Sequence, residues 1–215
     1  MYEYIFFDLD GTLIDPKEGI TKSVQYALDK FNIRVNNLDE LTVFIGPPLK
    51  DSFMEYYHMT KDEATLAIKY YRERFKVYGI CECTLYNNVI NTLDTLKSLN
   101  KKLVIATSKP EEFTIEILKK LDIYKYFDFI AGATFNGARS KKSDIIKYAI
   151  KSLNILDLSK VIMVGDRKFD ILGAKTNNIS SVGVTYGYAL NNELQECKSD
   201  YIINDLLELI NIIKK

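Results

Sequence analysis

The chain has few of the features that mark secreted, membrane-bound or nucleic-acid-binding proteins. Only three of its 215 residues are cysteines, Cys81, Cys83 and Cys197, and no CxxC pair is present. An odd count without such a pair argues against a disulfide framework or a zinc site and favours a reducing compartment. The 29 basic and 29 acidic side chains cancel to a net charge of zero, which argues against nucleic acid or a membrane surface as a partner.

Long apolar runs and targeting signals are also missing. No stretch approaches the roughly 20 apolar residues that cross a bilayer, and no targeting segment precedes the first expected strand. We therefore expect a cytoplasmic protein. The four prolines and ten glycines are scattered along the chain, so long disordered linkers are not expected. The length suits one domain with a large insertion, or two small domains.

The first half of the chain predicts one strand followed by a helical insertion. An apolar strand is expected at about residues 4 to 9, and no convincing strand follows until about residue 102. Apolar residues recur between them at helical spacing, at Ile20, Val24, Ala27 and Phe31 and at Ala64, Ile68, Tyr71, Phe75 and Tyr78. We expect residues 16–82 to form a helical domain of their own, inserted into a core made of residues 1–15 and 83–215.

From about residue 87 the chain alternates between helix and strand. Helices are expected at about 87–100, 111–121 and 144–153, and apolar strands at 103–106, 129–131, 161–164, 181–185 and 201–203. Continuous apolar strands joined by helices indicate a parallel sheet covered on both faces. The predicted fold class is therefore α/β, with a doubly wound parallel sheet of the Rossmann type. Ligands of such sheets bind at the carboxyl ends of the strands.

Two acids at the end of the first strand carry the strongest chemical signal. Asp8 and Asp10 are separated by one residue, so their side chains should point the same way. Neighbouring carboxylates at a strand end are costly unless a cation or a proton separates them. One carboxylate can attack while the other transfers protons, and a divalent metal can hold the pair together.

Hydroxyl and lysine side chains are expected at the same edge of the sheet. Thr107, Ser108 and Lys109 follow the second core strand, and Lys141 and Lys142 stand ahead of a helix. A hydroxyl, a lysine and a metal together form a pocket for a phosphoryl group. The oxygens of that group carry charge that must be neutralised while attack and departure proceed in line.

Two further acids complete the set of metal ligands. Asp166 and Asp170 follow the strand at 161–164 with a spacing of four residues, which places both on one face at a helix start. Carboxylates suit a hard cation such as Mg²⁺. The only histidine, His58, is interpreted as structural, since a lone histidine is rarely a sufficient metal site.

Four segments together resemble the motifs of the haloacid dehalogenase superfamily. They are DLDGTL at 8–13, IATSK at 105–109, a lysine near 142 and VGDRKFD at 164–170. The resemblance spans the whole chain and implies the family's α/β core. The insertion at 16–82 resembles the helical cap domain of the phosphoglycolate-phosphatase-like branch. IGPPLKDSF at 45–53 and TYGYALNNEL at 185–194 resemble that branch too.

The resemblance implies a role for each acid. Asp8 would be the nucleophile that forms an aspartyl phosphate, and it would also bind Mg²⁺. Asp10 would protonate the leaving alcohol and then activate water, while its backbone carbonyl binds the metal. Asp166 would be a further metal ligand, with Asp170 beside it or in the outer coordination shell.

The resemblance also implies the groups that bind phosphate. Thr107 and the backbone amide of Ser108 would hold the phosphoryl oxygens, and a lysine would pair with the nucleophile and the phosphate. We choose Lys142 because Ser143 is expected to cap the following helix. The prolines that often follow this lysine in the family are absent here, which keeps Lys141 as the alternative.

These roles imply a Mg²⁺-dependent phosphomonoester hydrolase acting on a small phosphorylated metabolite, as a monomer or a homodimer. Phosphoglycolate is the first expected substrate, followed by nucleoside 5'-monophosphates and sugar phosphates. A β-phosphoglucomutase-like phosphotransferase shares the cap and all four motifs and stays an alternative. Haloacid dehalogenases lack the second aspartate of the first motif, so the presence of Asp10 argues against dehalogenase activity.

Two readings from other protein classes fit the sequence less well. A non-catalytic receiver module would share the doubly wound sheet and the acidic Mg²⁺ site. It would have no use for Asp10 or for the insertion at 16–82. The segment GARSKKS at 137–143 does not form a P-loop, because no glycine stands directly before its lysines, as the P-loop spacing requires.

Overall fold

The computed structural model describes residues 1–214. The chain divides into two compact units. The core unit consists of Met1–Asp15 and Leu85–Lys215, and the inserted unit consists of Pro16–Thr84.

A sheet of six parallel strands forms the centre of the core unit. The strands are β1 Tyr4–Phe7, β4 Lys102–Pro110, β5 Phe129–Ala133, β6 Val161–Gly165, β7 Ser180–Val184 and β8 Tyr201–Ile203. Their order across the sheet is β5-β4-β1-β6-β7-β8, and each neighbouring pair runs parallel.

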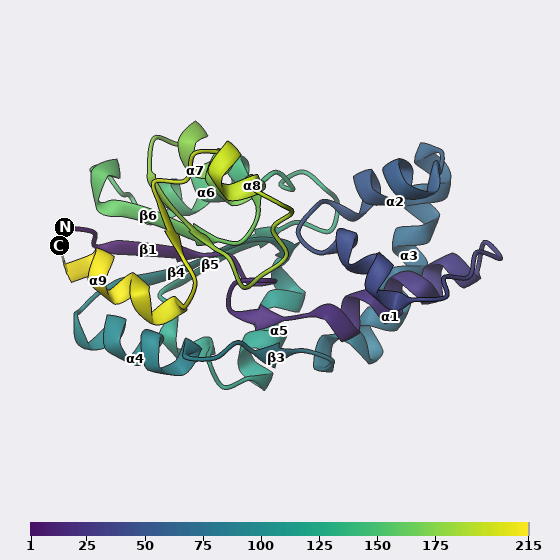
Figure 1. Ribbon diagram of the computed structural model, residues 1–215, viewed down its shortest axis with the longest axis horizontal. Helices are drawn as coiled ribbons and strands as arrows, with labels where there is room; N and C mark the ends of the chain where they lie inside the picture. The colour runs from purple at the N-terminus through teal and green to yellow at the C-terminus, as the bar shows by residue number, and fades with distance from the viewer. Residues whose placement is uncertain (215) are drawn as a thin grey trace. The chain divides into compact units, whose positions relative to one another are not determined.

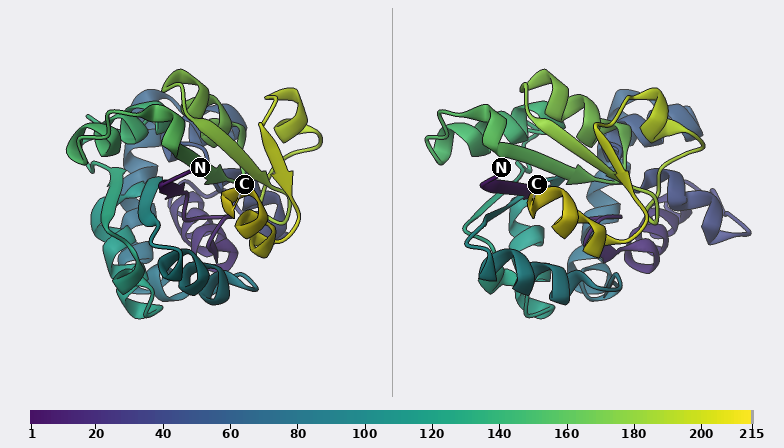
Figure 2. Two further views of the ribbon diagram at one scale, coloured as in Figure 1. Left: turned by 90° about the vertical axis from the view of Figure 1, so that its left-hand side faces the viewer. Right: turned by 60° about the vertical axis from the view of Figure 1, so that its left-hand side comes forward.

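Helices cover both faces of this sheet. Those of the core unit are α4 Val89–Ser98, α5 Glu111–Lys120, α6 Lys142–Ser152, α7 Lys168–Thr176, α8 Glu193–Glu196 and α9 Leu209–Lys214. Shorter 3-10 turns are η3 Tyr124–Tyr126, η4 Leu158–Lys160 and η5 Leu206–Glu208. Helices α6 and α7 pack together on one face, and α4, α5 and α9 lie on the other (Figures 1 and 2). The predicted doubly wound parallel sheet is confirmed.

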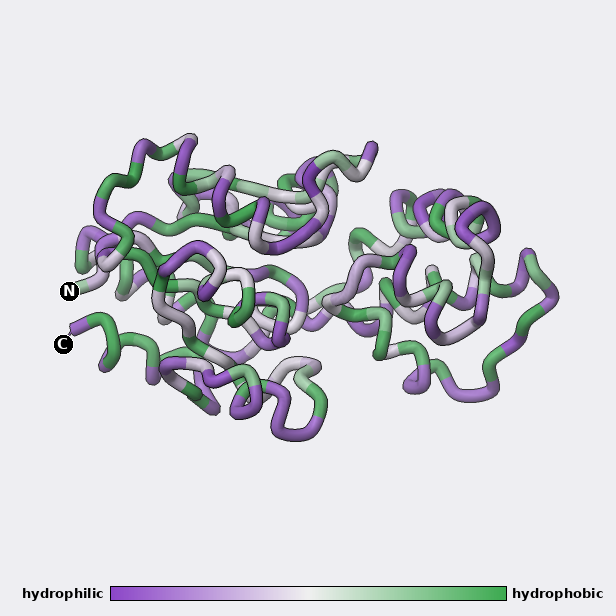
Figure 3. Tube along the Cα trace, turned by 90° about the horizontal axis from the view of Figure 1, so that it is seen from above, coloured by the Kyte–Doolittle hydropathy of each residue, from purple (hydrophilic) through white to green (hydrophobic). Residues whose placement is uncertain are grey.

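Burial on both faces explains the continuous apolar runs of the central strands. Ile5, Phe6 and Phe7 in β1 are all fully buried. Phe6 belongs to the core cluster under α6, with Val104 of β4 and Met163 of β6. Each such side chain contributes about 1.5–3 kcal/mol through burial. Hydrophobic stretches alternate with hydrophilic ones along the chain trace (Figure 3).

The position of β1 at the centre of the sheet gathers three strand ends. From β1 the chain passes through the inserted unit to β4 and β5 on one side, then returns to β6 on the other. Phe7 is in register with Ile105 of β4 and with Val164 of β6. The residues that follow these strands therefore meet at one edge, where ligands bind in open α/β sheets.

The expectation of a single strand before residue 102 is wrong in detail. Two short strands, β2 (Ile14–Asp15) and β3 (Thr84–Leu85), form a separate two-stranded sheet. Segments of two residues carry no periodicity that a sequence pattern can reveal. The first strand also ends at Phe7, because the carbonyl of Leu9 accepts hydrogen bonds from the backbone N–H groups of Leu13 and Ile14 and closes a turn.

The inserted unit is helical. It contains α1 Lys17–Asp29, α2 Leu49–Tyr57 and α3 Lys61–Val77, with 3-10 turns η1 Leu38–Phe44 and η2 Gly79–Cys81. Helix α3 packs on α1 and α2 and begins with a capping box between Thr60 and Glu63. His58 ends α2 in the left-handed conformation, with φ of 52°. Among residues 1–214 no helix is long and apolar enough to span a membrane.

Candidate active site

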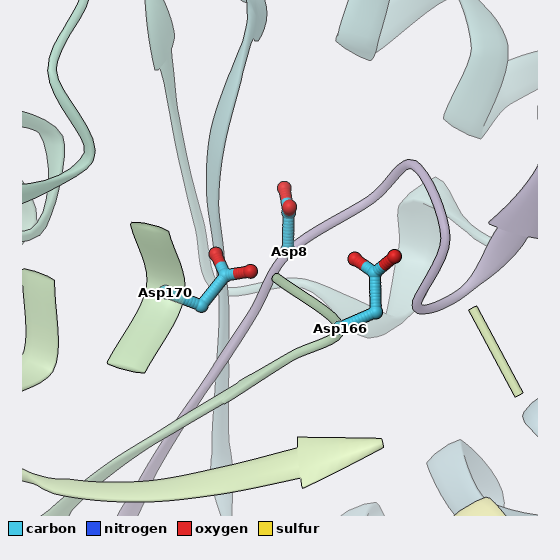
Figure 4. A group of neighbouring side chains, drawn as sticks. All are labelled: Asp8, Asp166 and Asp170. Atoms are coloured by element: carbon cyan, nitrogen blue, oxygen red, sulfur yellow. The ribbon is translucent and has the colours of Figure 1, made fainter. Parts of the chain in front are cut away.

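Three buried aspartates meet at the strand ends of the core unit. Asp8 follows β1, Asp166 follows β6, and Asp170 lies in the first turn of α7. One carboxylate oxygen from each residue lies within 4.8 Å of the other two. Figure 4 shows the three carboxylates directed to the same side of the strand ends. The structure thus brings Asp8 together with two acids that lie more than 150 positions later in the sequence.

Two glycines allow the backbone to approach these acids closely. A Cβ atom on Gly165 would lie 2.1 Å from Cγ of Asp170. A Cβ on Gly11 would lie 2.1 Å from Oδ2 of Asp166, and the φ of Gly11 is +79°, a conformation that favours glycine. Larger residues at either position would displace the acid beside them.

Backbone N–H groups complete the support of the two acids at the β6 end. The N–H of Tyr188 donates to Oδ2 of Asp166 at 2.7 Å, and the hydroxyl of Thr12 lies 3.4 Å from its Oδ1. The N–H of Arg167 donates to Oδ2 of Asp170 at 3.1 Å. Donation from these groups favours the charged form of each carboxylate.

Lys142 is the cation that pairs with this group. Its ammonium nitrogen lies 2.8 Å from Oδ1 of Asp8 and 2.8 Å from Oδ1 of Asp170. It also donates to the carbonyl of Ala106 in β4, where the regular pairing with β5 ends. Lys142 is buried, whereas the alternative, Lys141, is exposed. The side chain that reaches Asp8 is therefore that of Lys142.

The serine cap that the sequence predicts for the following helix is absent. Ser143 does not cap the helix, because α6 begins one residue earlier, at Lys142, with Lys141 at the N-cap. The carbonyl of Lys141 accepts the first hydrogen bonds, from the N–H groups of Asp144 and Ile145. The start of α6 brings Lys142 to the strand ends, and this position outweighs the capping preference of serine.

Burial among like charges shifts the pKa values of the group. Burial raises the pKa of Asp166 well above its usual value, and the carboxylates of Asp170 and Asp8 raise it further. Burial raises the pKa of Asp170 to about 6, although Lys142 lowers it. Burial lowers the pKa of Lys142, but Asp170 and Asp8 outweigh this effect and raise it overall. Lys142 is therefore charged at neutral pH.

The donor set fits a hard divalent cation. With all three carboxylates ionised, as a bound cation would require, the one ammonium leaves two negative charges, and oxygen atoms within 4.8 Å of one another are ligands that such a cation prefers. Asp8, Asp166 and Asp170 supply these oxygens. The side chain of Asp10 is not part of this group, so of the four expected metal ligands it could contribute only its backbone carbonyl here.

Asp10 lies instead against a second buried lysine, Lys109. The ammonium of Lys109 lies 2.6 Å from Oδ2 of Asp10. Burial raises the pKa of Asp10, and Lys109 lowers it, with a raised pKa as the net result. Sequence reasoning placed Lys109 at the strand end but assigned it no role. Its position directly after Thr107 and Ser108, the two residues expected to bind phosphate, is the sequence feature that could have indicated a role for Lys109.

The two residues expected to bind phosphate lie where β4 departs from regular pairing. The register of β4 with β5 shifts between Ala106 and Pro110. Thr107 is buried, and its hydroxyl oxygen accepts a hydrogen bond from the N–H of Lys109 at 3.3 Å. Ser108 is half-buried. A hydroxyl that accepts from the backbone keeps its own proton for donation.

Sequence reasoning also assigned no role to the loop after β7. Its Tyr188 supports Asp166 through the backbone, and the Tyr188 hydroxyl donates to Asp15. Glu193 accepts from Arg167 Nε at 3.0 Å and from the N–H of Lys168 at 2.5 Å. This loop lies within the segment TYGYALNNEL, which resembles the phosphoglycolate-phosphatase-like branch. Its hydrogen bonds hold the β6 end of the site in place.

Comparison with known proteins agrees with this geometry. The family model described as haloacid dehalogenase-like hydrolase matches residues 5–184. A 5'-nucleotidase of Pseudomonas aeruginosa is 38% identical over 213 residues, covering 99% of this chain and 96% of that protein. A phosphoglycolate phosphatase of Colwellia psychrerythraea is 29% identical, covering 99% of this chain and 97% of that protein.

A solved structure gives the same result. The crystal structure of a protein described as a predicted phosphatase from Clostridium acetobutylicum has a TM-score of 0.96 and 47% identity, covering 100% of both chains. The family model spans most of the chain, and the relatives align over nearly their full length. The resemblance inferred from the four motifs is thereby confirmed. The chain belongs to the haloacid dehalogenase-like hydrolases and is a phosphatase of that family.

Proposed function

We propose that the chain is a Mg²⁺-dependent phosphomonoester hydrolase that acts through an aspartyl phosphate on Asp8. The observation that carries this proposal is the Lys142 ammonium, 2.8 Å from Oδ1 of Asp8 and 2.8 Å from Oδ1 of Asp170. This buried cation can neutralise a phosphoryl oxygen beside the nucleophile. The excess negative charge of the acids supports a divalent cation, which would be held by Asp8, Asp166 and Asp170.

Hydrogen bonds indicate which oxygen of the nucleophile reacts. Oδ1 of Asp8 accepts from the N–H of Leu9 at 2.8 Å and contacts Lys142. With Oδ1 engaged twice, Oδ2 attacks phosphorus, and the bond from phosphorus to the leaving oxygen breaks. When bound, the metal supplies neutralisation of charge on the transferring group. Thr107 and the amide of Ser108 hold the phosphoryl oxygens.

Asp10 handles the protons in both half-reactions. It first protonates the oxygen of the leaving alcohol, and its carboxylate then takes a proton from the water that attacks the aspartyl phosphate. Hydrolysis returns the carboxylate of Asp8 and releases phosphate. The inserted helical unit, residues 16–84, is proposed to act as the cap domain that excludes bulk water and selects the leaving group.

Two substrate classes are the leading candidates. The motif resemblance favours phosphoglycolate. The 38% identity with a 5'-nucleotidase, compared with 29% for a phosphoglycolate phosphatase, favours a nucleoside 5'-monophosphate.

The three cysteines form no disulfide among residues 1–214, which supports a reducing, cytoplasmic location.

A panel of phosphorylated metabolites tests the proposal. Phosphate release is measured as kcat/KM for phosphoglycolate, nucleoside 5'-monophosphates and sugar phosphates, with Mg²⁺ and with a chelator. Asp8→Asn serves as the matched control, since it keeps the side-chain volume but removes the nucleophilic oxygen, and we expect turnover to fall by at least about 10³-fold. Near-normal kcat in this variant would exclude the covalent route.

A further inference from the structure

A second buried lysine in the core unit lies against the proposed acid-base residue. The ammonium of Lys109 lies 2.6 Å from Oδ2 of Asp10, and only 5% of the Lys109 side chain is exposed. Lysine is rarely buried to this degree unless it is paired. The contact joins residues that are 99 positions apart, so it depends on the register of β4 beside β1.

The two oxygens of Asp10 differ sharply in their surroundings. Oδ2 is held by Lys109, whereas Oδ1 is buried and has no hydrogen-bond partner among residues 1–214. An unpartnered buried carboxylate oxygen is costly. The cost is removed when the oxygen meets a hydroxyl of a substrate or a water molecule.

We propose that Lys109 is a positioning residue that holds Oδ2 of Asp10 and thereby leaves Oδ1 as the oxygen that exchanges protons with the leaving group and with water. This inference rests on the proposed hydrolase function. The fixed pairing restricts rotation of the carboxylate, so Oδ1 stays in one orientation through both half-reactions.

The proton is balanced across the two steps. In the first step the bond from Asp8 Oδ2 to phosphorus forms, the bond from phosphorus to the alcohol oxygen breaks, and the proton on Asp10 Oδ1 moves to that oxygen. In the second step the water oxygen bonds to phosphorus, the bond from Asp8 to phosphorus breaks, and the water proton moves to Oδ1. The side chain of Lys109 takes no part in either proton transfer.

The backbone of Lys109 has a separate task that a side-chain substitution leaves in place. Its N–H donates to the hydroxyl oxygen of Thr107. This bond does not depend on the side chain, so changing Lys109 tests its contact with Asp10 and leaves the orientation of Thr107 unaltered. Lys109→Met removes the charge at similar length, and Lys109→Arg keeps a cation.

Lys101 offers a matched control at the opposite end of β4. It is 8% exposed, as is Lys109, and its ammonium donates to the carbonyl of Tyr2 at 2.8 Å. Lys101→Met therefore removes an equally buried lysine away from the strand ends that carry the site. We expect the activity of this variant to match that of the unaltered protein.

The decisive experiment compares leaving groups in single-turnover kinetics with Mg²⁺. p-Nitrophenyl phosphate releases a weakly basic phenolate that needs little protonation, whereas glycerol 2-phosphate releases a basic alkoxide that needs a proton. We expect Lys109→Met to slow the phosphorylation of Asp8 by glycerol 2-phosphate on the order of 10²-fold. The slowing with p-nitrophenyl phosphate should be smaller than this by a factor of at least about ten. Hydrolysis of the phosphoenzyme should slow equally after either substrate, and Lys109→Arg should recover part of both rates.

Equal slowing of phosphorylation with both substrates in Lys109→Met would overturn the proposal, because a merely structural defect ignores the leaving group. If Lys109→Met does not give a folded far-UV circular dichroism spectrum, Lys109→Arg and Lys109→Gln carry the same comparison. Absence of a phosphoenzyme in the unaltered protein with either substrate would instead contradict the proposed hydrolase function itself.

Discussion

The ammonium nitrogen of Lys142 lies 2.8 Å from Oδ1 of Asp8, and both side chains are buried. The same nitrogen lies 2.8 Å from Oδ1 of Asp170. A single cation therefore joins the end of β1 to the start of α7. Because this cation contacts two of the three clustered acids, its removal should affect both catalysis and the ionisation of the site.

Lys142→Met tests this joint role. We expect kcat/KM to fall on the order of 10²- to 10³-fold, because the charge that neutralises the transferring group is lost. Lys142→Arg keeps the charge and should retain more activity than Lys142→Met. Steady-state kinetics at saturating Mg²⁺ check the prediction, and equal activity of the two variants would contradict it.

Removal of the divalent cation should abolish turnover, and Asp166→Asn should weaken metal binding. Loss of an outer-shell partner alone typically costs 10- to 100-fold in metal affinity, so loss of a carboxylate ligand should raise the half-saturating Mg²⁺ concentration by at least about that factor. Mg²⁺ titration of activity and calorimetry measure the shift. Asp122→Asn, which alters an exposed ion pair with Lys125, is the control and should leave the titration unchanged.

The metal-free protein should lose stability as the pH rises through the pKa of Asp170. Burial raises that pKa to about 6, against the lowering effect of Lys142, so the folded chain binds this proton more tightly than the unfolded chain. The stabilisation is complete below the ordinary value of 3.8 and is lost as pH rises through about 6. The loss amounts to at most about 3 kcal/mol of unfolding free energy.

Urea unfolding in the presence of a chelator, at about pH 5 and about pH 8, measures the part of this loss that falls above pH 5, roughly half of it. Asp170→Asn removes the titrating group and should reduce the difference between the two pH values. Saturating Mg²⁺ should also reduce it, because the cation stabilises the ionised acids. The same pH dependence in Asp170→Asn and in the unaltered metal-free protein would show that other groups cause the loss.

The buried pair of Arg167 and Glu193 should contribute far more to folding than an exposed pair does. Glu193→Gln removes the carboxylate charge that lies 3.0 Å from the buried Arg167 Nε, and we expect a loss on the order of 3 kcal/mol of unfolding free energy. Glu3→Gln removes one partner of the exposed Glu3–Lys160 pair and should cost less than about 1 kcal/mol. Chemical denaturation of both variants makes the comparison, and similar losses would contradict it.

The apolar runs and the residues directly after them were sufficient to predict the sheet and the candidate acids. Both features are local: a buried strand is recorded in its own side chains, and a parallel sheet brings the carboxyl ends of its strands to one edge. The order of residues along the chain is therefore enough to expect Asp8, Asp166 and Asp170 together. The short strands β2 and β3 escaped prediction, because two residues carry no periodic signal.

Tertiary structure alone decided which partners these residues have. The pairing of Lys109 with Asp10 arises only when β4 lies beside β1 in one register, and no local pattern encodes that distance. The choice of Lys142 over Lys141 follows from the start of α6 and not from the expected serine cap. Charge pairing between distant segments depends on three-dimensional position, whereas strand burial and helix periodicity can be recognised from the order of neighbouring residues in the sequence.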